Sequence, residues 1–132
     1  MGPRIGIIGG GAIGGYTGGM LTKAGHDVTI VDQWPEHVAA VKANGLTIQH
    51  GDDEVNVAAN YININELQSI DDPFDYAFVA VKSYDTEWAA TLMRRYLKPD
   101  GAYVDFQNGI NDYRLAETVG QENALGCVIT IA

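Results

Sequence analysis

Half of the chain's glycines lie in one short segment near its N-terminus. Residues 4–21 read RIGIIGGGAIGGYTGGML and contain eight of the 16 glycines in the 132-residue chain. Glycine destabilises the interior of a helix or strand by about 0.5–1 kcal/mol relative to alanine, so this concentration needs a reason. The order of residues indicates one: a buried apolar strand over residues 4–9, a glycine-rich turn, and a helix over residues 12–24 that Gly25 terminates.

The turn carries the spacing of a dinucleotide-binding loop. Gly9, Gly11 and Gly14 form G-x-G-x-x-G, in which the first glycine makes the turn, the second admits a pyrophosphate, and the third allows close packing of helix on strand. Amides at the helix N-terminus would bind the phosphates. A second apolar strand, DVTIVD, ends on Asp32, where a carboxylate binds the adenosine ribose. The predicted cofactor contacts are Gly9, Gly10, Gly11, Ala12, Ile13, Gly14 and Asp32. The alternative is a glycine-rich turn in which Asp32 only caps a helix.

Asp32 also bears on which cofactor would bind. A carboxylate at this position accepts hydrogen bonds from ribose hydroxyls and repels a 2′-phosphate. The segment that follows, DQWPEH, contains no arginine that could bind such a phosphate. The sequence therefore favours NAD, with NADP as the alternative.

The rest of the chain continues to alternate strands and helices. Helices are predicted over residues 36–43, 85–97 and 111–119, the second with Asp85 or Thr86 as its N-cap, and strands over 74–82, 102–106 and 124–132. Between them, LTIQH and EVNVAANYINI flank an acidic turn and indicate an antiparallel hairpin, and residues 99–101 indicate another turn. This order predicts one α/β domain over residues 1–132: a Rossmann-type, doubly wound, mostly parallel sheet with helices on both faces.

Composition excludes several classes of function. A net charge of −9 and an isoelectric point near 4.5 are unsuited to nucleic acid or an anionic membrane surface. No apolar run reaches the roughly 20 residues of a membrane span. The single cysteine, Cys127, cannot form an internal disulfide, and its apolar neighbours indicate an inert core thiol. The three histidines are scattered and are expected on the surface, and the acidic run 52–54 is expected at a solvated turn. We therefore expect a cytoplasmic protein without a metal site.

Two later segments carry a family resemblance. FVAVKSYDT places Lys82 after one strand, and DFQNGI places Asn108 after the next, at the edge where open α/β sheets bind ligands. With GGGAIGG, they make the chain similar over essentially its whole length to the N-terminal domain of the ketopantoate reductase (2-dehydropantoate 2-reductase) family. By themselves, Lys82 could be a solvated lysine and Asn108 a turn residue.

The resemblance implies an oxidoreductase that reduces a small 2-keto acid with a nicotinamide cofactor, usually NADPH. It implies that Lys82 and Asn108 lie near the nicotinamide ribose and the substrate, and that Ala132 lies at the nicotinamide end. One departure is that the family usually has a small residue and an arginine where this chain has Asp32 and Gln33. This departure again favours NAD.

The resemblance also implies a helical C-terminal domain that supplies the proton-donating lysine and much of the substrate site. The chain stops within an apolar strand at Ala132, so we expect it to be one domain of a longer protein, for which a homodimer is an open alternative. We expect this domain alone not to turn over substrate. Two other functions share the glycine loop: a nucleotide-sensing domain of potassium transport, and the cofactor domain of another hydroxy-acid, glycerol-phosphate or opine-type dehydrogenase. Neither requires the Lys82 and Asn108 segments.

Overall fold

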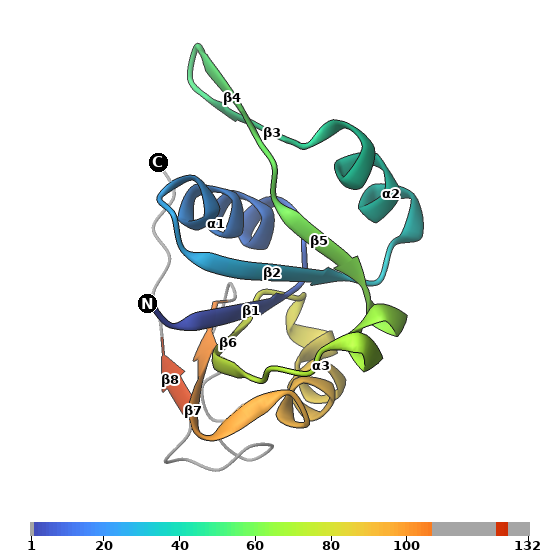
Figure 1. Ribbon diagram of the computed structural model, residues 1–132, viewed down its shortest axis with the longest axis vertical. Helices are drawn as coiled ribbons and strands as arrows, with labels where there is room; N and C mark the ends of the chain where they lie inside the picture. Colours follow the sequence, from blue (N-terminus) through green and yellow to red (C-terminus); the bar gives the residue numbers. More distant parts are fainter. Residues whose placement is uncertain (1, 107–123, 127–132) are drawn as a thin grey trace.

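The computed structural model describes residues 2–106 and 124–126, and its centre is a parallel six-stranded sheet (Figure 1). The strands lie in the order β5-β2-β1-β6-β7-β8, and each pairs with its neighbours in parallel. Their bounds are β1 Arg4–Ile8, β2 Asp27–Asp32, β5 Asn60–Asn63, β6 Phe74–Val79, β7 Leu97–Asp105 and β8 Ala124–Gly126. The order reverses beside β1, as expected of the predicted doubly wound fold, which is confirmed.

Helices cover both faces of the sheet. Helices α1 (Ala12–Lys23) and α2 (Pro35–Asn44) lie on one side, and α3 (Thr86–Arg94) lies on the other (Figure 1). The buried residues divide accordingly. Ile5 and Ile7 join a cluster with Val38 of α2, whereas Ile8 joins a cluster with Met93 of α3. This alternation along β1 is what a strand buried on both faces requires.

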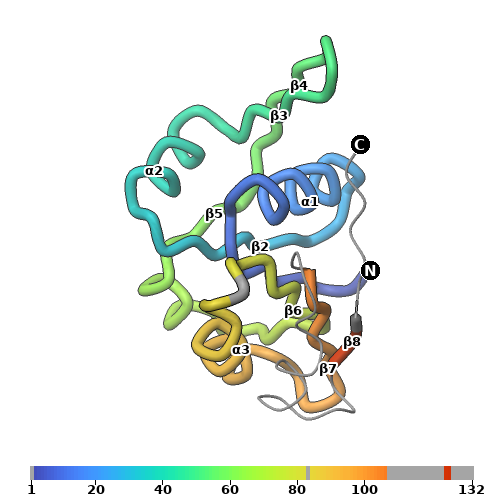
Figure 2. Tube along the Cα trace, turned by 180° about the vertical axis from the view of Figure 1, so that it is seen from behind, coloured from blue at the N-terminus to red at the C-terminus, as the bar shows by residue number. Residues whose placement is uncertain are grey.

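The predicted hairpin near residues 46–58 is confirmed, although the strand-like run EVNVAANYINI extends past its end. Strands β3 (Leu46–His50) and β4 (Asp53–Val57) pair in antiparallel register and project from the body of the molecule (Figures 1 and 2). The prediction that EVNVAANYINI continues as one hairpin strand is wrong. The Ala59 N–H donates to the carbonyl of Val57, and the chain then re-enters the main sheet as β5, parallel to β2.

A short 3-10 helix, η1 (Ile64–Ser69), connects β5 to β6. Its start is a capping box that the sequence analysis did not identify, in which the Asn63 side chain accepts a backbone N–H and the Glu66 carboxylate accepts the N–H of Asn63. Lys42 of α2 donates to Glu66 at 2.7 Å. Together these bonds hold the pKa of Glu66 below its ordinary value, chiefly through the Asn63 backbone.

Several predicted boundaries in the second half are corrected. Strand β6 ends at Val79 rather than at residue 82, and α3 ends at Arg94 rather than at residue 97. The predicted turn at residues 99–101 lies within β7 as an irregularity, since Phe74 pairs with Leu97 whereas Tyr76 pairs with Ala102. Asp85 is the N-cap of α3, as predicted, but its carboxylate accepts the indole N–H of Trp88 at 2.7 Å instead of a helix amide.

Three predictions about structural elements and the core fall partly or wholly outside the described residues. Only residues 124–126 of the predicted strand over 124–132 are described, and they pair with β7. The predicted helix over 111–119 and Cys127 lie outside. In the part of the chain that is described, no helix is long and apolar enough to cross a bilayer.

Candidate functional site

The glycine loop joins the end of β1 to the start of α1, and two of its glycines are required by close contacts. Gly9 has φ +109°, and a Cβ on it would lie 2.7 Å from the backbone of Ala80. A Cβ on Gly14 would collide with the carbonyl of Gly9 and lie 3.1 Å from the Ala80 side chain. The Gly9 N–H donates to the Val31 carbonyl at 2.8 Å, which ties the turn to β2. Helix, turn and the β6 edge therefore pack at backbone contact distance.

Gly11 differs from its neighbours because no contact among the described residues requires a glycine there. It is exposed, its φ of −75° is ordinary for any residue, and a Cβ on it would have no described heavy atom within 4 Å beyond its chain neighbours. It occupies the N-cap of α1, where the first amides of a helix lack intrahelical partners. Open space in front of free amides is the arrangement that a phosphate group can approach.

Asp32 lies where the sequence predicts it, at the carboxyl end of β2 and beside the glycine loop. Its Oδ1 accepts the N–H of Trp34 at 3.1 Å, and its Oδ2 lies 2.8 Å from where a Cβ on Gly10 would stand. The carboxylate is half-buried, and Trp34 is 64% exposed. The hydrogen bond from Trp34 fixes the carboxylate, which leaves its second oxygen facing the loop.

Two residues that contact the glycine loop were not predicted from the sequence. The Tyr61 hydroxyl of β5 donates to the Gly10 carbonyl at 3.0 Å, and His37 Nε2 of α2 lies 3.1 Å from the same oxygen. The two rings meet edge to face at 5.3 Å. His37 is thus half-buried, which corrects its expected surface position. Burial, with a smaller effect from the Asp32 charge, raises the pKa of Tyr61 to about 12, so the hydroxyl retains its proton.

The additional glycines of the segment have packing reasons. A Cβ on Gly10 or Gly15 would lie 2.7 to 2.8 Å from the Tyr61 side chain. A Cβ on Gly18 would meet Ile30 at 2.5 Å, and one on Gly19 would meet Ile48 of the hairpin at 2.6 Å. The local sequence does not identify these neighbours, since each comes from a different strand. The glycine run therefore lets two strands and a hairpin approach α1 closely.

Lys82 lies at the same edge of the sheet. It is exposed and follows β6 by three residues, in a turn that is closed by the Asp85 N–H donating to the Lys82 carbonyl at 2.8 Å. Its neighbour Ala80 is the residue against which Gly9 and Gly14 pack. The described residues thus bring together the glycine loop, Asp32 and the turn that carries Lys82. Asn108 and Ala132 lie outside them.

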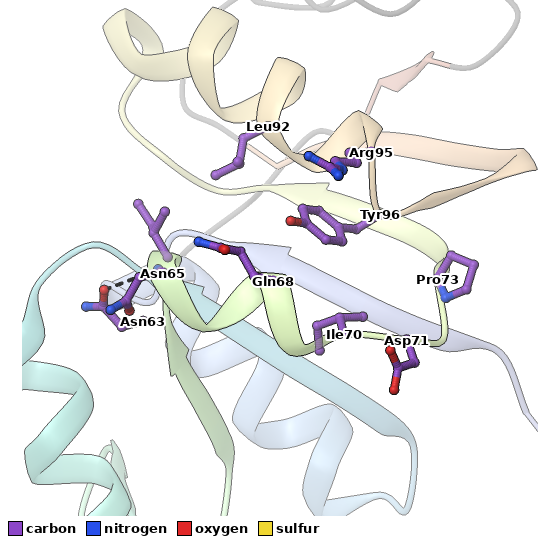
Figure 3. Close-up of a pocket in the computed structure, with 10 residues that line it drawn as sticks. Asn63, Asn65, Gln68, Ile70, Asp71, Pro73, Leu92, Arg95 and Tyr96 are labelled. Atoms are coloured by element: carbon purple, nitrogen blue, oxygen red, sulfur yellow. Dashed lines mark hydrogen bonds between the residues drawn. The ribbon is translucent and has the colours of Figure 1, made fainter.

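The described residues border cavities both at the predicted site and away from it. One of about 370 Å³ is bordered by the start of α1, His37 and β3. A larger one, of about 910 Å³, lies between the η1 segment and the end of α3, where Leu92, Arg95 and Tyr96 lie across from Gln68 and Ile70 (Figure 3). None of the predicted site residues lines the larger cavity, although Asn63 at its rim is the register neighbour of Asp32. The predicted cofactor contacts Gly10, Gly11 and Ala12 instead border the smaller cavity.

Comparison with known proteins agrees with this geometry. The family model described as ketopantoate reductase PanE/ApbA matches residues 5–132. A 2-dehydropantoate 2-reductase of Pyrococcus abyssi is 35% identical over 130 residues, which cover 96% of this chain and 40% of that protein. One from Lactococcus lactis is 48% identical over 66 residues, which cover 50% of this chain and 20% of that protein.

Solved structures show the same fold. A PanE/ApbA family ketopantoate reductase from Ralstonia eutropha superimposes with a TM-score of 0.84 at 29% identity, covering 98% of this chain and 42% of that one. A D-mandelate dehydrogenase solved with NADH and anilino(oxo)acetate has a TM-score of 0.80 at 29% identity, covering 92% of this chain and 38% of that one. The chain spans about two fifths of the length of these proteins. With the glycine loop at the end of β1 and a match from residue 5 to residue 132, the chain belongs to the ketopantoate reductase family.

Proposed function

We propose that this chain is the cofactor-binding domain of an NAD-preferring reductase that acts on a small 2-keto acid. The observation that carries the proposal is the unexplained glycine at the start of α1. No described heavy atom lies within 4 Å of where a Cβ on Gly11 would stand, whereas packing accounts for Gly9 and Gly14. Beyond its N-cap position, a ligand at backbone distance gives this glycine a reason that packing does not. A bound nicotinamide cofactor would supply the hydride, and the residues of this chain would bind and orient the cofactor.

Each predicted contact residue then has a specific role in binding the cofactor. Amides of Gly11, Ala12 and Ile13 at the start of α1 would donate to the pyrophosphate. Asp32 would accept the adenosine ribose hydroxyls, and its charge would repel the 2′-phosphate of NADP. The D-mandelate dehydrogenase solved with NADH supports this preference, because it shares the fold at 29% identity.

The substrate end of the site involves fewer described residues. Lys82 offers three N–H donors at the edge of the sheet and would hold a substrate carboxylate or ketone oxygen together with Asn108. Ala132 would lie at the nicotinamide end. We further propose that a helical C-terminal domain supplies the proton donor, since the relatives are more than twice as long as this chain.

Titration calorimetry with NADH and NADPH tests the cofactor preference. The wild-type chain should bind NADH at least about tenfold more tightly, which is about 1.4 kcal/mol. Asp32→Asn keeps an oxygen for the Trp34 N–H but removes the charge, so the preference should narrow while the loop stays in place. Asp27→Asn is the matched control, because it makes the same charge change at the opposite end of β2. Tighter binding of NADPH by the wild type would contradict the proposal.

A further inference from the structure

The carbonyl of Gly10 is held by two side chains that come from different parts of the fold. Tyr61 reaches it from β5, 51 positions along the chain, and His37 reaches it from α2, 27 positions along. A carbonyl oxygen has two lone pairs and only accepts, so it can accept from both. The His37 contact is therefore a hydrogen bond when Nε2 carries the proton.

The fold makes room for this arrangement. Tyr61 is 1% exposed, and a Cβ would stand 2.7 Å from its ring if placed on Gly10 and 2.8 Å from its hydroxyl oxygen if placed on Gly15. His37 packs edge-on against the same ring at 5.3 Å. Gly10 and Gly15 lie outside the three fingerprint positions, and both leave the space that the Tyr61 side chain occupies.

Hydrogen bonds that fix the carbonyl of a peptide group also determine the direction of its N–H. The peptide unit between Gly10 and Gly11 is planar and trans, so its C=O and N–H point in opposite directions. With the carbonyl directed toward Tyr61 and His37, the Gly11 N–H is directed away from them, on the exposed side of the loop. Glycine residues on both sides would otherwise leave this peptide free to rotate.

We infer that Tyr61 and His37 are positioning residues that orient the Gly10–Gly11 peptide so that the Gly11 N–H faces the pyrophosphate of the cofactor. This inference rests on the proposed cofactor function. Through Tyr61 and His37, β5 and α2 would contribute to the affinity for the pyrophosphate. Recognition of the adenosine would depend on Asp32. A preorganised donor costs less ordering on binding, so loss of either tether should weaken binding of the pyrophosphate.

Tyr61→Phe tests the inference, with Tyr103→Phe as the matched control. Tyr103 is also 1% exposed, and its hydroxyl donates to a backbone carbonyl, that of Ala90, at 3.1 Å, but it lies in the cluster of α3. By calorimetry, Tyr61→Phe should bind NADH about fivefold to tenfold more weakly, whereas Tyr103→Phe should stay within about twofold of the wild type. Adenosine, followed by NMR titration, should bind Tyr61→Phe as it binds the wild type, because it has no phosphate.

A second pair of variants addresses His37 without relying on Tyr61. His37→Leu removes the donor and should weaken NADH binding by about threefold or more, whereas His37→Gln retains an N–H donor and should restore most of the affinity. Rescue by glutamine would not follow if the ring were needed only for packing.

The outcomes separate the inference from the function on which it rests. A wild-type chain that binds no NADH overturns the proposed function and the inference with it. NADH binding that is unchanged in Tyr61→Phe and His37→Leu overturns the inference alone, and equal losses for NADH and adenosine overturn it in favour of a general structural role. If Tyr61→Phe does not fold, the His37 pair decides.

Discussion

A methyl group at Gly11 should weaken the binding of NADH without destabilising the fold. Gly11→Ala adds a Cβ into space that holds no described heavy atom within 4 Å apart from the chain neighbours, and its φ of −75° suits alanine. Alanine is a poorer N-cap than glycine, but it also lowers the entropy of the unfolded chain, so the free energy of unfolding should change by less than about 1 kcal/mol. NADH affinity should fall by at least about 30-fold, or about 2 kcal/mol, because the methyl group stands where the pyrophosphate would approach.

Gly14→Ala is the contrasting variant. Its Cβ would collide with the carbonyl of Gly9, which cannot rotate away because Gly9 has φ +109° and packs against the backbone of Ala80. Overpacking costs about 1–3 kcal/mol when side chains can adjust, and more is expected against backbone. The gain in helix propensity offsets only about 1 kcal/mol. We expect a net loss of at least about 2 kcal/mol, or roughly 5–10 °C in Tm.

For each variant, thermal melts followed by circular dichroism give the Tm, and titration calorimetry gives the affinity for NADH. The expected pattern is a normal Tm with weak binding for Gly11→Ala, and a lowered Tm for Gly14→Ala. A folded Gly11→Ala variant that binds NADH like the wild type would refute the argument that the open space serves a ligand. A Gly14→Ala variant with unchanged Tm would refute the packing argument.

Two further predictions concern the substrate end and high pH. In the two-domain protein proposed above, Lys82→Ala or Asn108→Ala should lower kcat/KM for the keto acid at least about tenfold with an unchanged Tm. Full activity of the double variant would remove both residues from the site. The 132-residue chain should bind NADH without turnover. Burial raises the pKa of Tyr61 and of Tyr103 to about 12, above the ordinary value of 10, so only the unfolded state releases these protons as the pH passes 10. The free energy of unfolding should therefore be insensitive to these groups below about pH 10 and fall by up to about 2–3 kcal/mol per tyrosine toward pH 12. Urea melts at pH 8 to 11 measure this fall, and a Tyr61→Phe, Tyr103→Phe double variant that loses stability as steeply as the wild type would contradict it.

The sequence alone determined the parts of the fold that depend on local chemistry. An apolar strand, a turn that needs positive φ at Gly9, and a helix beginning at Ala12 are recognisable because each depends on neighbouring residues. Asp32 was placed correctly because it directly ends a continuous apolar run. The alternation of such runs with helices then predicted the doubly wound sheet, since parallel strands need crossover connections.

Only the tertiary structure decided how distant segments meet. The run EVNVAANYINI has strand character throughout, but nothing local shows that it leaves β3 after Val57 and joins β2 at Asn60, because strand propensity does not specify the partner. For the same reason, Tyr61 and His37 could not be assigned to the glycine loop. Their shared contact at Gly10 exists only once β5 and α2 lie beside the glycine loop, where Gly10 and Gly15 leave the space that an alanine methyl would fill.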